Sequence, residues 1–348
     1  MTPTEPQIVL TISGIGLSAR AGDVFTPGKG VIAGVDVSWQ ALGVRFSESG
    51  SVATIGVLVR RPAALVGGTL TVPVHLRTTT KGSTANLRLV PSGPSSIALA
   101  DGSDASEIAA ALDPVVGGWF REPLVGLDGW YRTDGALPMI VGPAKVDGPV
   151  IRWEIATGLP AAPVDAGERA LRPGMADDFT MAVSTELVTM LAQGHWTPVL
   201  RAGDPLPSLA IPGDFTIAVG RPNKTDRGFE VPSLARTAGR CRFADLRTEA
   251  QPAASDGGLS WKAPSRIGMP ASHKVSDEER NALAATALDV LSAPLAALPL
   301  TGPKRYQAQA RIVRSHENTL LLDGVLGAVK GRRLPKGPPP PIVPSATR

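Results

Sequence analysis

Apolar residues occur in short blocks along most of this chain, and Gly, Pro and polar residues separate the blocks. Three such blocks follow one another near the N-terminus, at Val31–Trp39, Ser51–Val59 and Gly68–His75. Short apolar runs bounded by turn residues are typical of antiparallel strands. The pattern therefore predicts a β module, preceded by a first strand at Gln7–Ser13 and a turn-rich bridge at Gly28–Gly34.

The middle of the chain has the same character. Further strands are predicted at Leu87–Val90, Trp119–Phe120, Gly129–Tyr131, Val150–Ile155, Phe179–Val183 and Phe215–Val219. Two of these segments have similar sequences, Asp178-Phe-Thr-Met-Ala-Val183 and Asp214-Phe-Thr-Ile-Ala-Val219. A repeat architecture requires at least three copies, and the sequence shows no third copy. We therefore interpret the pair as two similar strands.

Helical patterns are rare in this sequence. The clearest one begins at Ser276, where Ser276-Asp-Glu-Glu279 forms a capping box and an apolar stripe follows as far as Pro294. Residues 97–115 contain a shorter helical pattern, which we expect Pro114 to stop. Two strand-like segments within residues 308–325 then predict a hairpin with a polar turn.

These patterns predict a mainly β fold, built of antiparallel β-sandwich or barrel modules with one clear helix near residues 276–293. A Ser/Gly/Pro stretch at residues 92–96 marks the first boundary. The predicted modules are an N-terminal antiparallel β module (1–95), a Trp-containing β-rich middle domain (96–262), a helix plus hairpin module (263–330) and a basic, Pro-rich tail (331–348). The proline run of the tail predicts extended polyproline II structure.

Composition supports this picture. The chain contains 38 Gly and 33 Pro, well above average usage, as many short strands and turns require. The single cysteine, Cys241, excludes an internal disulfide and a multi-cysteine zinc site, and we expect a reduced, partly buried thiol. No apolar run predicts a membrane span. Met1–Gln7 has no secretory signal pattern, so we expect synthesis and folding in a cytoplasm.

Basic residues concentrate toward the C-terminus. The segment from Lys304 to Arg348 has nine basic and two acidic residues, a net charge of +7, whereas the whole chain carries +4. Such a segment either contacts an anionic partner or remains solvated. Nucleic acid is not the favoured partner, because Tyr306 is the only aromatic residue in the segment and stacking on bases requires several.

Candidate catalytic patterns are mostly missing. The four histidines, His75, His195, His273 and His316, have no spacing that resembles a metal pair, and neither His-Glu-x-x-His nor Gly-x-Ser-x-Gly occurs. Spacing alone does not exclude a triad assembled from distant residues. The sequence therefore predicts no catalytic, cofactor-binding or metal-binding residue and no cofactor.

One motif imitates a dinucleotide site. Gly14-Ile-Gly16-Leu-Ser-Ala19 fits Gly-x-Gly-x-x-Ala, and Asp36 stands about twenty residues on. Such a site needs a helix directly after the glycines, and the glycines and proline at 22–30 predict that no helix forms. The adjacent carboxylates Asp177-Asp178 and Glu278-Glu279 would face opposite sides of a strand, so they do not predict a glycosidase pair.

Tryptophans are concentrated in the middle of the chain, at Trp119, Trp130, Trp153, Trp196 and Trp261. Large aromatic side chains dominate the packing of protein interiors, so we interpret these residues as core anchors. A carbohydrate-binding platform would instead need several of them exposed and coplanar.

The opening strands also resemble a known family. Val35-Asp-Val-Ser-Trp39, followed by a Ser/Gly turn and Ser51-Val-Ala-Thr-Ile-Gly-Val57, is similar to the N-terminal module of minor tail and tail-tip proteins of long-tailed actinobacterial phages. The likeness covers about residues 31–75, and the Ala, Gly, Pro and Arg bias is also similar. That family often continues from the tryptophan with Gly-Arg, whereas Gln40-Ala41 follows here.

This resemblance implies a non-enzymatic structural protein of a phage tail tip or baseplate. Such a protein is made in the host cytoplasm, is located in the virion tail, assembles with other tail proteins and with copies of itself, and supports host attachment. Two alternatives remain open: a carbohydrate-binding β protein that contacts the bacterial cell wall, and a hydrolase whose catalytic groups meet only in the folded chain. If the tail serves assembly, removal of residues 331–348 should leave folding intact and impair assembly.

Overall fold

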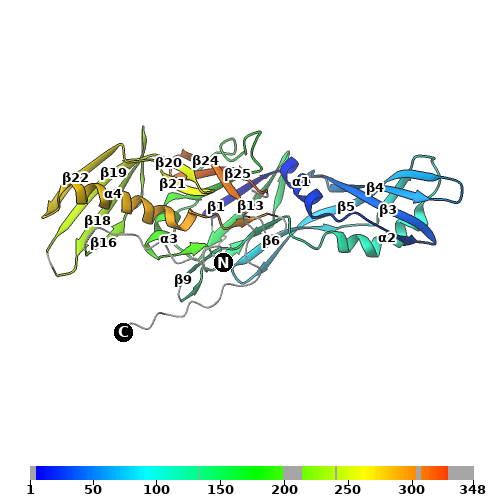
Figure 1. Ribbon diagram of the computed structural model, residues 1–348, viewed down its shortest axis with the longest axis horizontal. Coiled ribbons are helices and arrows are strands. Elements are labelled where there is room, and N and C mark those ends of the chain that lie inside the picture. Colours follow the sequence, from blue (N-terminus) through cyan, green and yellow to red (C-terminus); the bar gives the residue numbers. More distant parts are fainter. Residues whose placement is uncertain (1–4, 133, 199–213, 240, 303–306, 328–348) are drawn as a thin grey trace.

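The computed structural model describes residues 5–132, 134–198, 214–239, 241–302 and 307–327. The fold is mainly β, as predicted, with antiparallel sheets and four α-helices in these residues. The molecule is elongated, with one sheet at each end and a third sheet between them (Figure 1). The predicted polyproline tail, residues 331–348, lies outside the described residues.

The central sheet combines strands from widely separated parts of the chain. Its order is β11-β13-β1-β14-β25-β24, with β12 also paired to β13. The bounds are β1 Ile8–Ser13, β11 Met139–Val141, β12 Lys145–Asp147, β13 Val150–Thr157, β14 Phe179–Ser184, β24 Gln309–His316 and β25 Thr319–Val325. The sheet therefore takes strands from three of the predicted modules, and the division into modules stays a prediction.

The first end sheet follows the order β2-β3-β4-β5-β6-β8-β23, with β7 paired to β5. Its strands are β2 Gly28–Ile32, β3 Val35–Arg45, β4 Ser51–Arg60, β5 Leu65–Lys81, β6 Thr84–Pro91, β7 Ser96–Leu99, β8 Val125–Leu127 and β23 Leu300–Thr301. The predicted turn-rich bridge at Gly28–Gly34 is wrong, because β2 pairs with β3. The turn between them is Ala33-Gly34, where both residues have positive φ.

The second end sheet follows the order β16-β18-β19-β22, with β17 paired to β18. Its strands are β16 Phe215–Val219, β17 Asn223–Thr225, β18 Gly228–Thr237, β19 Phe243–Ala250 and β22 Arg266–His273. Two smaller sheets complete the described structure: one contains β9 Trp130–Arg132, β10 Gly135–Ala136 and β15 Thr197–Pro198, and the other contains β20 Pro252–Ser255 and β21 Gly258–Trp261.

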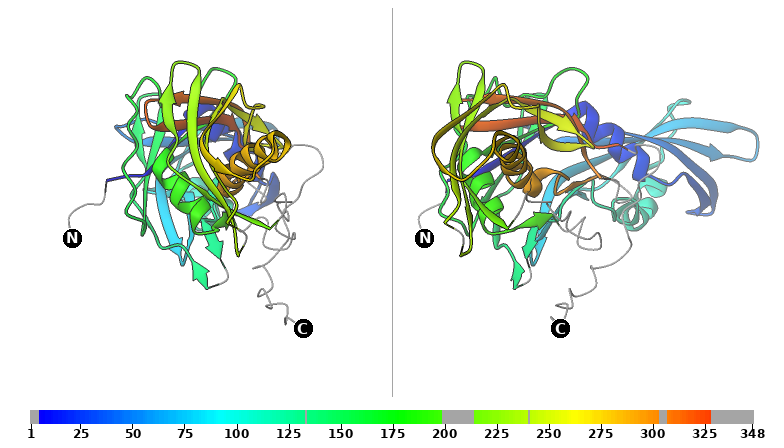
Figure 2. Two further views of the ribbon diagram at one scale, coloured as in Figure 1. Left: turned by 90° about the vertical axis from the view of Figure 1, so that its left-hand side faces the viewer. Right: turned by 60° about the vertical axis from the view of Figure 1, so that its left-hand side comes forward.

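The helices are α1 Gly14–Val24, α2 Ser106–Trp119, α3 Thr185–Gln193 and α4 Asp277–Ser292, and the short 3-10 helix η2 spans Ala293–Leu295. The capping box of α4 is confirmed, since Glu279 N donates to Ser276 Oγ at 3.2 Å and Ser276 N donates to Glu279 Oε2 at 2.9 Å. α4 packs against β16, β18 and β19 and lies beside α3 (Figure 2).

The prediction that Pro114 stops the earlier helix is wrong, because α2 continues to Trp119 with Pro114 inside it. Proline removes one main-chain hydrogen bond from a helix and disfavours its continuation. Here the helix buries Ile108, Leu112 and Val116 in the core. Tertiary packing supplies most of the stability of a helix, so this burial outweighs the local cost.

The described part of the chain contains two units whose main elements follow the same order, with further short strands between them. Each unit has a strand, a helix, a four-stranded meander, a second helix and a hairpin. The first unit is β1-α1-(β3-β4-β5-β6)-α2-(β12-β13), and the second is β14-α3-(β16-β18-β19-β22)-α4-(β24-β25). The similar sequences predicted as strands are β14 and β16, which both belong to the second unit, so they are not the basis of this duplication.

A local two-fold axis relates the two units at the centre of the sheet. Ser13 caps α1 and Ser184 caps α3, which makes residues 171 positions apart counterparts in these strands and helices. Leu10 pairs directly with Met181, which is also its counterpart. When two equivalent residues pair directly with each other, the two-fold axis must pass midway between them. The axis therefore passes between Leu10 and Met181.

Main-chain hydrogen bonds repeat in the same way. Three bonds of the first unit each have a counterpart in the second. The bond from Gly14 N to Pro149 O corresponds to that from Thr185 N to Asn318 O, and both are 2.9 Å long. The bond from Ser13 N to Asp178 O (2.7 Å) corresponds to that from Ser184 N to Gln7 O (3.1 Å), and the bond from Gln7 N to Ile155 O (3.1 Å) corresponds to that from Asp178 N to Gly324 O (2.7 Å). The two-fold relation therefore extends from the strands to the hairpins and helix starts.

The main core extends from the central sheet toward both ends of the molecule. Its largest fully buried side chains are Trp130, Trp153, Phe179 and Phe229. Among the helices in the described part of the chain, none is both long enough and apolar enough to span a bilayer.

Candidate functional site

The four histidines lie on different elements. His75 is in β5, His195 follows α3, His273 is in β22 and His316 ends β24. In the described ranges, no group of three or more His, Cys, Asp or Glu residues is placed to hold a metal ion. The expectation of a partly buried thiol is wrong, because Cys241 is exposed, in the turn between β18 and β19.

A helix does follow the glycine motif, contrary to the prediction, because α1 begins at Gly14. Ser13 Oγ caps it by accepting from Gly16 N at 3.4 Å, and Leu17 and Ala21 are buried, so packing outweighs the poor helix propensity of glycine. A Cβ at Gly16 would lie 2.5 Å from Asp178 Oδ1. Gly16 thus makes room for a carboxylate of the protein itself, where a dinucleotide would place its phosphates.

The tryptophans belong to the interior. Trp130 and Trp153 are fully buried, and their indole N–H groups donate to Pro294 O at 2.8 Å and Gly142 O at 3.0 Å. Trp196 is also buried, and the remaining three, Trp39, Trp119 and Trp261, are partly buried against the main core. The interpretation as core anchors is confirmed, and these six residues form no exposed platform.

An ion pair between the exposed Arg314 and the buried Asp323 links strands β24 and β25, and Thr180 ties β14 to the same carboxylate. Asp323 is only 3% exposed, and its Oδ1 accepts from Thr180 Oγ1 at 2.6 Å and from Arg314 Nη2 at 2.9 Å. The hydrogen bonds and charge of Asp323 raise the pKa of Arg314. Burial, followed by the charge of Asp323, raises the pKa of Asp177. Since the partners of these groups are other groups of the protein, the cluster has a structural role.

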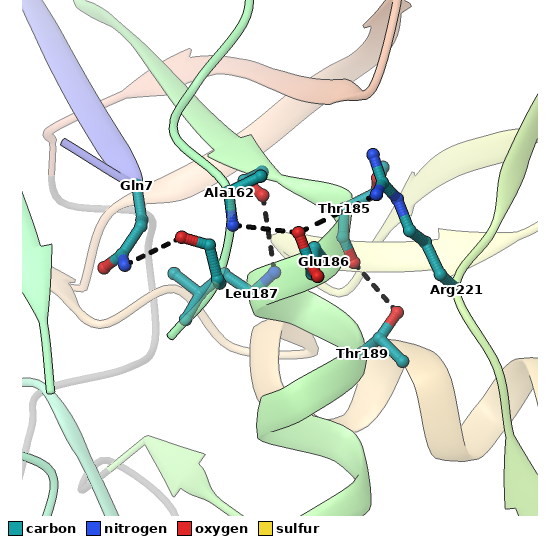
Figure 3. Close-up of polar contacts among 9 residues, drawn as sticks. Gln7, Ala162, Thr185, Glu186, Leu187, Thr189 and Arg221 are labelled. Carbon is teal, nitrogen blue, oxygen red and sulfur yellow. Dashed lines mark hydrogen bonds and ion pairs between the residues drawn. The ribbon is translucent and has the colours of Figure 1, made fainter. Parts of the chain in front are cut away.

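The segment that connects the two units crosses the start of α3 (Figure 3). Ala162 N donates to Glu186 Oε2 at 2.9 Å, and Arg221 Nη1 lies 3.7 Å from the same oxygen. Gln7 Nε2 donates to the carbonyl oxygens of Leu159 and Ala161 at 2.8 and 3.1 Å. We call Gln7, Glu186 and Arg221 the α3 clasp. A carboxylate in the first turn of a helix is favoured by the helix dipole, which suits the position of Glu186.

The hairpin β24–β25 holds the next part of the same segment. Asp165 N donates to Thr319 Oγ1 at 3.0 Å, and Thr319 Oγ1 is 3.2 Å from Asp165 O. Val164 packs with Val9 and Ala182 in a small separate cluster on the central sheet. The connecting segment, here called the linker (residues 158–177), is therefore held by Gln7 at its start and then by α3 and the β24–β25 hairpin of the second unit.

The first unit has an open groove at the counterpart position. This α1 groove has a volume of about 620 Å³, and the residues that line it include Ile15, Ala19, Gly22, Leu42, Phe46 and Pro149. Ile15, which is 84% exposed, is the counterpart of Glu186. Phe46 follows β3 as Arg221 follows β16. The groove thus has the apolar side chain of Ile15 where the second unit has Glu186, and Asp23 and Arg45 also line it.

Sequence reasoning missed both the clasp and the groove. Glu186 carries no motif, and Ile15 lies in the glycine motif that was considered only as a dinucleotide site; the two residues are about 170 positions apart. One signal could have indicated them: in two places an apolar strand ends in a serine, Ser13 or Ser184, that caps a following helix.

No protein-family model and no curated protein matches the chain. Among solved structures, the chain is similar to one described as the crystal structure of lipopolysaccharide binding protein. The match has 12% sequence identity and a TM-score of 0.38, and it covers 94% of this chain and 100% of the other. A TM-score this low does not establish a common fold, so the match assigns neither a family nor a ligand to this chain.

Proposed function

We propose that this chain is a structural subunit of the tail tip of a long-tailed phage, and that it assembles with copies of itself and with other tail proteins through the edges of its sheets. The resemblance of residues 31–75 to tail-tip proteins supports the first part. The placement of exposed apolar residues on the outermost strands carries the second.

Three outermost strands each expose a large apolar side chain. Val31 in β2 is 69% exposed, Ile140 in β11 is 52% exposed and Ile312 in β24 is 53% exposed. In the sheets of the described residues, β2, β11 and β24 are terminal strands. An edge strand offers unpaired main-chain groups to another chain, and proteins that remain monomeric usually protect edges with charge. Apolar residues at these edges favour strand addition from a partner.

The position of the edges also favours assembly. β11 and β24 terminate the central sheet on opposite sides. A copy that pairs its β11 edge with the β24 edge of the next copy makes a heterologous contact, which closes into a ring or continues as a filament. Rings of this kind suit a tail tip. Ala310 N donates to Gly257 O at 2.8 Å, so the start of β24 already has a main-chain partner. The free part of this edge lies nearer Ile312.

The test uses the purified full chain, with light scattering after size-exclusion chromatography and negative-stain electron microscopy. We expect oligomers that appear as rings. Ile140→Lys and Ile312→Lys each place a charge on an edge and should shift the chain to the monomer. The matched control is Leu234→Lys, because Leu234 is 46% exposed but lies on β18, an interior strand. The control should assemble like the unchanged chain.

A chain that stays monomeric at every concentration, or edge variants that assemble as well as the control, would contradict the proposed assembly. The location in the virion has its own test: antibodies against the chain should label the tail tips of the phage. If the antibodies label another part of the particle, or no particle at all, the assignment to a tail is contradicted.

A further inference from the structure

We propose that the C-terminal segment of this chain, beginning at residue 328, binds in the α1 groove as the linker binds in the α3 clasp. The linker follows the hairpin of the first unit and binds the second unit. The C-terminal segment follows the hairpin of the second unit, so the two-fold relation directs it to the first unit.

The two segments leave their strands in the same way. At the end of β13, Thr157 N donates to Gln7 Oε1 at 2.6 Å. Just after β25, Leu326 N donates to Asp178 Oδ2 at 2.9 Å. Gln7 and Asp178 are counterparts, as their matched main-chain hydrogen bonds show. A side-chain oxygen of the same position in each unit therefore fixes the chain at the point where the segment begins.

The described chain ends close to the groove. Gly327 lies beside α1, because a Cβ on Gly327 would be 3.3 Å from Arg20 Nη1. Arg20 is on the same helix as Ile15, Ala19 and Gly22, which line the groove. Residues 328–348 follow, and an extended polyproline II chain spans about 3.1 Å per residue.

The composition of the segment fits the groove. In the hairpins, counterparts are 169 positions apart, as Pro149 and Asn318 show, so the counterpart of Ala162 is Gly331. The residues around Gly331 include Val329 and Leu334, which match the apolar lining that replaces Glu186 and Arg221. Covering a side chain as exposed as Ile15 removes apolar surface from water, which is favourable.

Charge does not decide the occupant, because Asp23 in the groove already pairs with Arg20 Nη1 at 2.7 Å. Residues 328–348 carry five basic and no acidic side chains. Asp23 lines the groove, and Glu48 accepts from Gly148 N at 3.0 Å at its edge. Arg45 lines the groove as well, so apolar contact rather than charge is the main source of binding.

Disulfide trapping in the full chain tests the proposal. In a Cys241→Ser background, Ala19→Cys is combined with Leu334→Cys. The matched control combines Ala176→Cys with Leu334→Cys, because Ala19 and Ala176 are both exposed and Ala176 is two residues from Asp178, which holds Leu326. We expect an intramolecular disulfide to form at least about tenfold faster in the groove pair, since binding raises the effective concentration of the two thiols.

A second pair of variants tests whether the groove causes the faster disulfide formation. Ile15→Lys should lower the rate of the Ala19/Leu334 pair to that of the control, whereas Leu65→Lys, at a residue 61% exposed and outside the groove, should leave it unchanged. Both changes are at exposed positions, and circular dichroism verifies the fold of each variant.

Equal rates in the groove and control pairs would overturn the proposal. So would disulfide-linked dimers in place of the intramolecular product, because they would make the segment of a second copy the occupant. The intramolecular product and a linked dimer differ in mass on a non-reducing gel whether or not the chain assembles, so the outcome is independent of the proposed assembly in a tail.

Discussion

Leu10 and Met181 face each other on the two-fold axis, and we expect truncation of either one to destabilise both units together. Both side chains are fully buried and belong to the main core. Leu10 in β1 pairs directly with Met181 in β14, and these two strands join the two halves of the central sheet. A cavity at this point therefore weakens the junction between the units.

The expected magnitude follows from the atoms removed. Leu10→Ala deletes three buried carbons, worth about 2.4 kcal/mol in lost transfer free energy, and the residual cavity raises the loss to about 3–4 kcal/mol. Met181→Ala should cost about 2–3 kcal/mol, since a flexible thioether packs less specifically than leucine. In the double variant the two deletions share one cavity, so the loss should fall short of the sum by about 1 kcal/mol.

Urea denaturation followed by circular dichroism and tryptophan fluorescence measures these losses. The two probes should give one coincident transition for each variant, because the central sheet belongs to both units. Leu65→Ala, at a residue 61% exposed, is the control and should change the free energy of unfolding by less than about 0.5 kcal/mol. A loss below about 1 kcal/mol for either core variant, or two separate transitions, would refute a shared core on the axis.

Three further predictions concern local interactions. Ser276→Ala removes the cap of α4 and should lower the free energy of unfolding by about 1 kcal/mol in the same assay, whereas Ser276→Asp should retain most of it. Burial and the charge of Asp323 raise the pKa of Asp177, so the folded chain keeps a proton that the unfolded chain releases, and stability falls as pH rises from the usual carboxyl pKa to the raised one. Asp177→Asn should remove this fall in melting temperature with rising pH in a series of thermal melts. An unchanged dependence of melting temperature on pH would contradict this account. Trp130→Phe leaves the carbonyl of Pro294 without its donor and should cost about 2–3 kcal/mol by urea denaturation, and a loss under about 0.5 kcal/mol would count against it.

Local signals gave correct predictions where one short segment contains all the necessary residues. The capping box at Ser276 and the apolar stripe behind it are enough to specify α4. The hairpin of β24 and β25 was likewise predicted, because two alternating segments flank a polar turn. The tryptophans were correctly placed in the core, since side chains of this size are rarely stable on a surface in such numbers.

Local signals failed where packing opposes propensity. Gly14 and Gly16 make α1 a poor helix by propensity, yet the helix forms because Ser13 caps it and Leu17 is buried. Pro114 should interrupt α2, but the burial of neighbouring residues keeps the helix continuous. In both cases the decisive contacts come from other parts of the chain, which a short window of sequence does not contain.

The sequence by itself determined the mainly β class, most strand positions, the α4 cap and the lack of a recognisable catalytic pattern. Only the tertiary structure decided that two units are related by a local two-fold axis, with Leu10 paired to Met181 and the linker bound at Glu186. The physical reason is that alternation and capping act over a few residues, whereas strand pairing between β1 and β14 joins residues about 170 positions apart. Such pairing depends on complementary packing of the whole sheet, and so does the groove beside α1.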